Sequence, residues 1–224
     1  MIATKGAAET LSRDAVIERA LALADAEGLD AVTIRRLGQE FGVTPMALYW
    51  HVKNKEELLD AMGDRIFAAV ELDYASTALW DEQLRAVVRA LVQAMRAHPT
   101  CVELAYRRIF GSAEGQRLAE HTLGLLRRAG FTVRQTADIA SHALQTAVML
   151  VSAEPGAEPG FNEDERNENL AVKRAGLMAL PADVFPYIRE AADELLHCDD
   201  MADYYEFGID MFVAGARATL ADTA

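Results

Sequence analysis

The sequence predicts an all-α protein in two parts, a compact group of short N-terminal helices and a larger helical C-terminal part. Apolar residues recur at helical spacing along most of the chain, and almost no segment alternates with a period of two. Helix caps and glycine stops separate the apolar segments. With 224 residues, 51% of them hydrophobic and 25% charged, the chain can bury a sizeable core.

Four short helices are expected in the first seventy residues, because each apolar segment there follows a capping residue. Pro45 directly after Thr44 suits a first helical position, and Glu57 three residues after Asn54 resembles a capping box. Glycines stop two of the segments. The predicted helices run from Ser12 to Gly28, from Thr33 to Gly42, from Thr44 to about His51, and from Asn54 to about Val70.

The C-terminal part is predicted to hold longer helices around one polar loop. The segment 154–168 contains two prolines and six acidic residues, which is typical of a solvated loop. We expect one unit over 1–62 and a second unit over 63–224. The helices expected in the second unit cover about 81–98, 102–110, 113–129, 132–153, 182–197 and 201–221.

Composition excludes several classes of protein. Cys101 and Cys198 lie far apart without metal-ligand spacing, so neither a disulfide scaffold nor a zinc module is indicated. The start has no apolar leader and no stretch approaches eighteen apolar residues, so we expect a reduced cytoplasmic protein without membrane association. No GxSxG, HExxH, GxGxxG or P-loop pattern occurs, and we expect no enzyme, no cofactor and no metal.

The segment 32–62 is typical of a helix-turn-helix. Its apolar positions face inward on two helices, and Gly42 suits the turn between them. The formal net charge is −13, yet residues 33–55 hold four Lys or Arg against the single acid Glu40. Phosphate responds to local cations, since the Debye length is only about 8 Å. Two amphipathic helices that merely fill a core remain the alternative interpretation.

The run LYWHVKNKEELLDAM, which begins at Leu48, resembles the DNA-binding module of TetR-type transcriptional repressors, closest to the tetracycline-repressor branch. The similarity continues more weakly through LWDEQLRAVVRAL, LGLLRRAGFT and EFGIDMFVAGA. It implies a helix-turn-helix module joined by a connecting helix to a ligand-binding and dimerisation domain. In the family this connecting helix moves when a ligand binds, so DNA is released.

The resemblance also implies roles for residues of this module. Arg35 would contact the operator, Thr33 would bring a helix N-terminus to a phosphate, and base reading would fall to the start of the third helix. Trp50 could either contact DNA or pack beneath the recognition helix. The predicted DNA-binding residues are Thr33, Arg35, Thr44, Pro45, Met46, Ala47, Tyr49, Trp50, His51 and Lys55, of which Tyr49, His51 and Lys55 would hold phosphates.

A homodimer is expected, because one helix-turn-helix reads too few bases and the family binds palindromes. Small residues recur on two C-terminal helices, which in the family pair with their copies in a four-helix bundle. Internal packing without a partner is the alternative for these faces. The predicted interface residues are Ala140, Ala143, Ala147, Val151, Gly208 and Gly215.

A small-molecule pocket is the second implication of the resemblance. The family's drug-binding places align with Glu71, Val87, Ala105 and Thr122, and neither family histidine is retained, so metal–tetracycline is not the expected effector. His121 and His142 lie nearby, though a lone helical histidine is more often structural. A largely apolar pocket is expected instead, with candidate lining residues Tyr74, Leu91, Tyr106, Phe110, Ser141 and Met149.

Three functions are compatible with the sequence. The favoured one is a repressor that binds a palindromic operator as a homodimer and is released by a small molecule. A DNA-binding activator, or a regulator controlled by a partner protein, is the second. A helical small-molecule-binding protein or enzyme with a vestigial DNA module is the third, and the basic patch and capped recognition helix speak against it.

Overall fold

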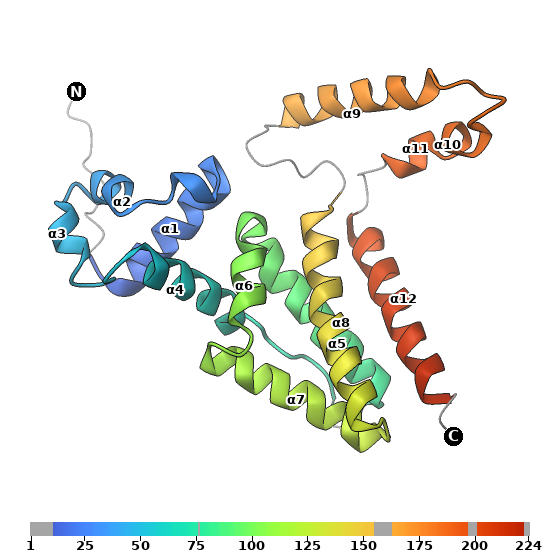
Figure 1. The fold of residues 1–224 in the computed structure, drawn as a ribbon, viewed down its shortest axis with the longest axis horizontal. Helices are drawn as coiled ribbons and strands as arrows, with labels where there is room; N and C mark the ends of the chain where they lie inside the picture. Colours follow the sequence, from blue (N-terminus) through green and yellow to red (C-terminus); the bar gives the residue numbers. More distant parts are fainter. Residues whose placement is uncertain (1–10, 76, 155–162, 197–200, 222–224) are drawn as a thin grey trace.

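Every regular element that the structure describes is helical (Figure 1). The structure is a computed structural model, and it describes residues 11–75, 77–154, 163–196 and 201–221. The all-α prediction is therefore confirmed for these ranges. The N-terminal elements are α1 (Arg13–Glu27), the 3-10 helix η1 (Leu29–Ala31), α2 (Ile34–Phe41), α3 (Pro45–Leu48) and α4 (Lys55–Ala68).

The helix starts of the N-terminal part follow the predicted caps. The Ser12 side chain accepts a hydrogen bond from the Ala15 backbone N–H at 3.1 Å, and Asn54 Oδ1 accepts one from Glu57 at 2.7 Å. Each cap satisfies an N–H group that has no partner inside the helix. The core beneath these helices contains Leu21, Leu37, Leu48, Val52 and Leu58, all fully buried.

The third helix is shorter than predicted, because it ends at Leu48 and not near His51. The Leu48 carbonyl accepts hydrogen bonds from both His51 and Val52, at 2.9 and 3.0 Å. This tightened turn brings Val52 back into the core, where it is fully buried. The chain can then reach the cap of α4 two residues later.

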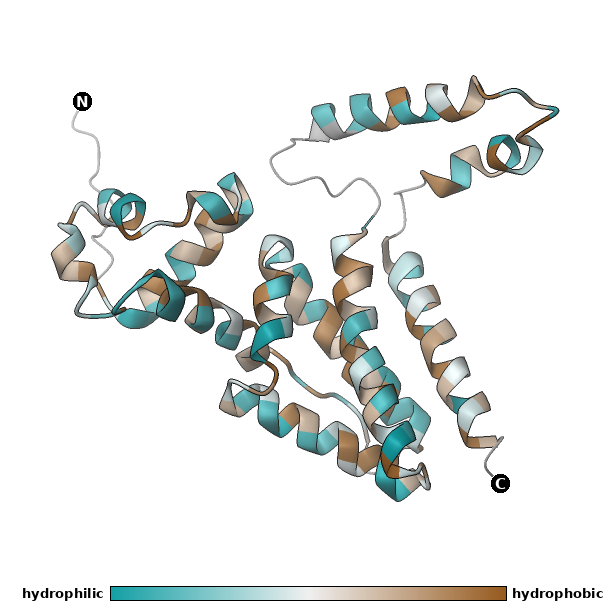
Figure 2. Ribbon diagram, in the orientation of Figure 1, coloured by the Kyte–Doolittle hydropathy of each residue, from teal (hydrophilic) through white to brown (hydrophobic). Residues whose placement is uncertain are grey.

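The C-terminal body is a bundle around α5. Its elements are α5 (Trp80–Arg96), the 3-10 helix η2 (Pro99–Cys101), α6 (Val102–Arg108), α7 (Ala113–Ala129), α8 (Val133–Ser152) and α12 (Met201–Ala221). Hydrophobic residues recur along α5, α8 and α12, as Figure 2 shows. Ion pairs add to this packing between α5 and α12, where Arg89 holds both oxygens of Glu206 at 2.6–2.7 Å.

The segment between α8 and α12 differs from the prediction. Residues 163–168 were expected in a loop, yet they begin α9 (Glu163–Met178), while residues 155–162 of that loop lie outside the described ranges. α9 is mainly hydrophilic (Figure 2), so it lacks the apolar stripe on which the prediction depended. Figure 1 shows it standing apart from the bundle with two further short helices.

The single helix expected over 182–197 is two short ones, α10 (Pro186–Glu190) and α11 (Ala192–Leu195). Pro186 explains the late start, because proline has no N–H group and fits only the first turn of a helix. The residue before a proline is also kept out of the helical region. The helix predicted over 201–221 matches α12, whereas Cys198 lies outside the described ranges.

α4 connects the two parts of the chain without a break. It runs through the predicted domain boundary at residues 62 and 63 and ends at Ala68. It packs on α1 at one side and on α6 at the other, and one hydrophobic cluster includes residues from Val16 to Val213. The division into 1–62 and 63–224 therefore remains a prediction.

Neither a membrane-spanning helix nor a metal-binding cluster is found in the part of the chain that the structure describes. None of its helices is both long enough and apolar enough to cross a membrane. Its His, Cys, Asp and Glu side chains form no group of three or more that could hold a metal ion.

Candidate nucleic-acid interface and ligand pocket

The turn between α2 and α3 is held by two glycines. Gly42 ends α2 with φ of 65°, a left-handed conformation that glycine adopts at little cost. At Gly38 an added Cβ would lie 3.1 Å from the Val43 carbonyl oxygen, so the absence of a side chain lets α2 approach the start of α3 closely. Thr33 caps α2 by accepting a hydrogen bond from the Arg36 N–H at 3.1 Å.

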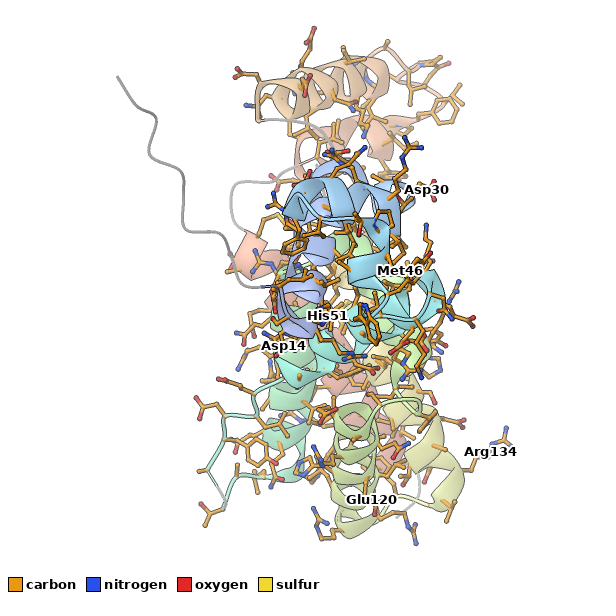
Figure 3. All side chains as sticks on the ribbon, turned by 90° about the vertical axis from the view of Figure 1, so that its left-hand side faces the viewer. Asp14, Asp30, Met46, His51, Glu120 and Arg134 are labelled. Atoms are coloured by element: carbon orange, nitrogen blue, oxygen red, sulfur yellow. The ribbon has the colours of Figure 1, made fainter. Side chains whose placement is uncertain are left out.

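The start of α3 projects from one end of the molecule. Figure 3 looks onto this end, where the labelled Met46 and His51 face the viewer. Thr44, Pro45 and Met46 are exposed, and the Met46 side chain is 68% exposed. Leu48, the last residue of this short helix, is fully buried and anchors it. α3 therefore presents its leading residues to solvent from a fixed position.

Two aromatic side chains follow α3 at the same end. Tyr49 is 46% exposed and Trp50 is 87% exposed. Of the two alternatives for Trp50, the structure disfavours packing beneath the recognition helix, because such a side chain would be buried. His51 is half-buried beside them. A flat, exposed indole next to a recognition helix is available for contact with a partner.

The cations of this end differ in their partners. The Arg36 guanidinium contacts Glu27 and Glu40 at 2.6 and 3.0 Å, so protein carboxylates already neutralise it. Arg35, Lys53 and Lys55 are exposed and form no ion pair with any residue that the structure describes. Unpaired cations around an exposed helix are suited to contact with phosphate.

A pocket of about 390 Å³ lies in the C-terminal body among α5, α6, α7 and α8, a size within the range of small-molecule sites. It contains four of the six predicted residues, namely Leu91, Tyr106, Phe110 and Ser141. Of the aligned drug-binding places, Val87 and Thr122 line it, whereas Glu71 and Ala105 do not. The remaining lining residues are Arg107, Ile109, Leu118, Ala119, Leu123, Ala137, Ala140, Ala143 and Leu144.

Tyr74 and Met149, the other two predicted residues, do not line this pocket, and their part in effector binding remains a prediction. The Tyr74 hydroxyl lies 2.5 Å from Nε2 of His121, so the tyrosine joins the segment after α4 to the outer side of α7. Burial lowers the pKa of His121, and the charge of Arg128 lowers it further. Met149 is 61% exposed on the opposite face of α8, where it lines a shallow groove beside α12.

Comparison with known proteins identifies the family. Residues 16–62 match the family described as bacterial regulatory proteins, tetR family, and residues 75–220 match the tetracyclin repressor-like C-terminal domain. The chain belongs to the TetR family. Its helix-turn-helix is thus that of a transcriptional regulator, and its helical body is the C-terminal domain of that family.

Individual TetR-family proteins show how the similarity is distributed. The repressor DrrR1 of Streptomyces coeruleorubidus is 34% identical over 131 residues, which cover 58% of this chain and only about half (48%) of DrrR1. The class D tetracycline repressor of Escherichia coli is 44% identical over 78 residues, 34% of this chain and 35% of the repressor. The crystal structure of Streptomyces coelicolor ActR with actinorhodin is 28% identical, with a TM-score of 0.75 over 95% of this chain and 99% of ActR.

Most of the small-residue face of α8 is buried within the chain, and its part in a dimer interface remains a prediction. Ala143, Ala147 and Val151 are buried in the core of this TetR-family body, and Ala140 and Ala143 line the pocket. Their small side chains let α5 approach α8 closely. Packing within one chain is thus one use of this spacing.

The two glycines of the predicted interface on α12 differ. At Gly208 an added Cβ would lie 2.4 Å from a methyl carbon of Leu150, so this glycine is covered by α8 of the same chain. At Gly215 a Cβ would meet nothing within 4 Å. Met149, Phe207 and Met211 are exposed apolar residues of these two helices, each more than 60% exposed.

The contact between α4 and α6 ties the helix-turn-helix to the pocket, and sequence reasoning missed its residues. A Cβ added at Gly63 would lie 2.9 Å from the Leu104 carbonyl oxygen and 2.8 Å from Cγ of Arg108. Arg108 in turn contacts Asp60 at 3.0 Å and Asp64 at 2.7 Å. An isolated glycine within a helical pattern was the available signal, because it often marks a close approach.

Proposed function

We propose that this TetR-family chain is a repressor that binds a palindromic operator as a homodimer and leaves it when a small molecule occupies the pocket. One observation carries the proposal. α6 supplies residues to the pocket and, through Gly63 and Arg108, packs directly on α4, the helix that follows the DNA-reading module. A ligand that displaces α6 therefore acts on the position of that module.

On DNA, α3 would enter the major groove with Thr44 to Ala47 toward base edges. Tyr49, His51 and Lys55 would contact phosphates, and Arg35 would contact a base edge or a phosphate. The support is exposure without internal partners: Met46 and Trp50 are largely exposed, and Arg35 and Lys55 carry no ion pair with a described residue. Thr33 uses its hydroxyl as a cap and would hold a phosphate through the helix start.

The dimer would form along the outer faces of α8 and α12. These two helices lie side by side and expose Met149, Phe207 and Met211, which on a lone chain would leave apolar surface in water. Gly215 is open on the same helix as Phe207 and Met211. A two-fold pair would place the two recognition helices at half-sites about 34–36 Å apart or a multiple of it.

Release requires a ligand that prefers the geometry incompatible with the operator. Such a ligand shifts the equilibrium by its difference in affinity for the two states, and a few kcal/mol suffices. The solved structure of ActR contains actinorhodin, and we propose an organic effector for this chain as well. Metal–tetracycline is not proposed, because the family's histidine ligands are not retained here. In this proposal the protein acts by binding in the cytoplasm, not by catalysis.

The test is operator selection from the DNA that flanks the protein's own gene, measured at several salt concentrations. We expect competitor-resistant binding to one palindrome. Lys55→Ala should weaken binding to every duplex and lower the salt dependence by about one phosphate contact per half-site. Arg134→Ala is the matched control, since Arg134 is exposed on α8 and its label in Figure 3 lies far from Met46.

Weak binding to any duplex that salt abolishes, without selection of a palindrome, would overturn the proposed operator function. An equal loss in Lys55→Ala and Arg134→Ala would overturn the assignment of Lys55 to a phosphate. Circular dichroism of both variants ensures that a loss of binding is not a loss of fold.

A further inference from the structure

Arg107 is the only charged residue among the described residues that line the pocket. It lies on α6 between Tyr106, which also lines the pocket, and Arg108, which turns toward α4. The rest of the lining is apolar or carries a hydroxyl group. Arg107 is itself exposed, so its charge stays hydrated at the edge of this apolar cavity and is available to the charged group of a ligand.

The two neighbouring arginines of α6 have opposite surroundings. Arg108 is held by the carboxylates of Asp60 and Asp64. Arg107 forms no ion pair with any residue in the described ranges, although Glu103 lies one helical turn before it. The charge of Arg108 is therefore compensated within the fold, and that of Arg107 is left to solvent or to a ligand.

The hydroxyl groups of the pocket divide in the same way. Thr122 donates its hydroxyl to the Leu118 carbonyl at 2.8 Å, as buried helical threonines often do. Tyr106 and Ser141 have no hydrogen bond to any described residue. Together with Arg107 they offer donors but no fixed negative charge. The polar part of the pocket is thus suited to an anion and unsuited to a cation.

The remaining wall is suited to an apolar ring system. Leu91 and Leu118 are buried at the base of the pocket, while Phe110 is 72% exposed and Tyr106 is 44% exposed at its edge. Aromatic side chains at the mouth of a cavity stack on flat ligands and bring large contact areas. A cavity of about 390 Å³ holds a molecule of modest size.

We propose that the pocket binds an aromatic organic anion, whose acidic group contacts Arg107 and whose ring system packs between α5, α7 and α8. This inference rests on the proposed function, which requires an effector in this pocket, and it names the chemical class of that effector. A carboxylate, a sulfonate or an acidic phenol would each supply the charge, since a guanidinium group can donate hydrogen bonds to any of them.

The test uses a matched pair of fluorescent probes and the intact protein without DNA. 8-Anilinonaphthalene-1-sulfonate is an aromatic anion, and N-phenyl-1-naphthylamine has the same ring skeleton without the sulfonate. Both probes are titrated against the wild type, Arg107→Gln, Arg134→Gln and Ala119→Trp. Arg134→Gln removes an exposed cation outside the pocket, and Ala119→Trp fills the pocket without changing its charge.

We expect Arg107→Gln to weaken the anionic probe about tenfold and to leave the neutral probe unchanged, because one charge-assisted contact is lost. Arg134→Gln should change neither, and Ala119→Trp should weaken both. Comparing the ratio of the two affinities between proteins cancels the difference in hydrophobicity between the probes. Higher salt should reduce the ratio in the wild type and not in Arg107→Gln.

Equal effects of Arg107→Gln on both probes would overturn the inference, and so would probe binding that Ala119→Trp does not reduce. Operator selection on the same preparation separates this inference from the proposed function. If the protein selects a palindrome but shows no Arg107-dependent preference for the anionic probe, only the inference of an anion-binding pocket is refuted. If the protein shows that preference but does not select a palindrome, the anion-binding pocket is supported and the proposed operator function is refuted.

Discussion

Arg108 of α6 and Asp64 of α4 form a two-point ion pair, in which Nε and Nη2 of the arginine lie 2.7 and 3.2 Å from the two carboxylate oxygens. Asp60, one turn earlier on α4, lies 3.0 Å from Nη1 of the same guanidinium. The hydrogen bonds that Arg108 donates to Asp64 raise the pKa of Arg108 above its ordinary value. One side chain thus fixes α6, which carries pocket residues, to the helix that follows the DNA-reading module.

Replacing this arginine tests the connection. Arg108→Ala should lower the free energy of unfolding by about 1–2 kcal/mol, because two carboxylates on α4 lose their counter-ion. The loss is not expected to be larger, because the hydrogen bonds of charged groups contribute less where the groups are partly exposed. Urea denaturation followed by circular dichroism measures the change. Arg117→Ala is the control, since Arg117 is 74% exposed and pairs with Glu114 one turn before it on α7. A loss as large in the control would refute a special role for Arg108.

The backbone contact beside this ion pair gives a second prediction. Gly63→Ala places a methyl group against the Leu104 carbonyl, which cannot move without α6, so the two helices must separate by a few tenths of an ångström. We expect a loss of about 1–3 kcal/mol in unfolding free energy and weaker transmission from pocket to DNA. Gly176→Ala in α9 is the control, because a Cβ there meets nothing within 4 Å and alanine favours helix.

How far the sequence predicts the fold depends on whether the signal is local. The caps at Ser12 and Asn54 are decided within three residues, and the structure confirms both. α9 was missed because a largely exposed polar helix has no apolar stripe to reveal it. Pro186 was a local signal that the prediction did not use, and it marks the late start of α10 within the segment where a continuous helix was expected.

The candidate site shows the same division. Exposure of Met46 was predictable, since it follows from helix position within a recognisable motif. The sequence did not predict which residues of α6 face the pocket and which face α4. Arg107 and Arg108 are neighbours with the same charge, and they differ only in what packs against them. Likewise, the small residues of α8 fit both an internal and an external interface, and the sequence alone did not show that Ala143, Ala147 and Val151 are buried within the chain.

Two substitutions at the reading end should separate base contacts from phosphate contacts. Met46→Ala should change which base is preferred at one operator position by about 1–3 kcal/mol, because its exposed side chain lies at the leading end of α3. Tyr49→Ala should weaken binding by about the same factor for every duplex, whatever its sequence. Titration of an operator and of single-base variants measures both effects. Identical behaviour of the two variants would mean that this division of roles is wrong.

Acid stability should depend on Asp81 at the start of α5. Burial raises the pKa of this carboxyl, but the hydrogen bond and charge of Arg217 on α12, with backbone hydrogen bonds, outweigh burial and hold the pKa below its ordinary value of 3.8. A lowered folded-state pKa stabilises the protein above the unfolded value, and this stabilisation is lost as the pH falls through the folded value. We therefore expect Arg217→Met to destabilise the protein at pH 7 much more than at pH 2.

Thermal unfolding of wild type and Arg217→Met across this pH range measures the difference. The Arg217 guanidinium lies 2.5 Å from the Asp81 carboxylate, and the carboxylate is largely buried while the arginine is half-exposed. An equal loss at both pH values would show that the arginine acts through its packing alone. Arg134→Met removes an exposed ion pair on α8 and should not change thermal unfolding measurably at either pH.

The exposed apolar faces of α8 and α12 predict a dimer in solution. At micromolar concentration, light scattering should give twice the 24.5 kDa mass of one chain. Phe207→Asp with Met211→Asp should give the single mass, because both side chains are more than 60% exposed and would lie in the interface, where an unpaired charge is costly to bury. Tyr187→Asp is the control, since Tyr187 is 80% exposed on α10, apart from these two faces. A monomeric wild type would contradict the dimer and remove the paired recognition helices on which palindrome binding depends.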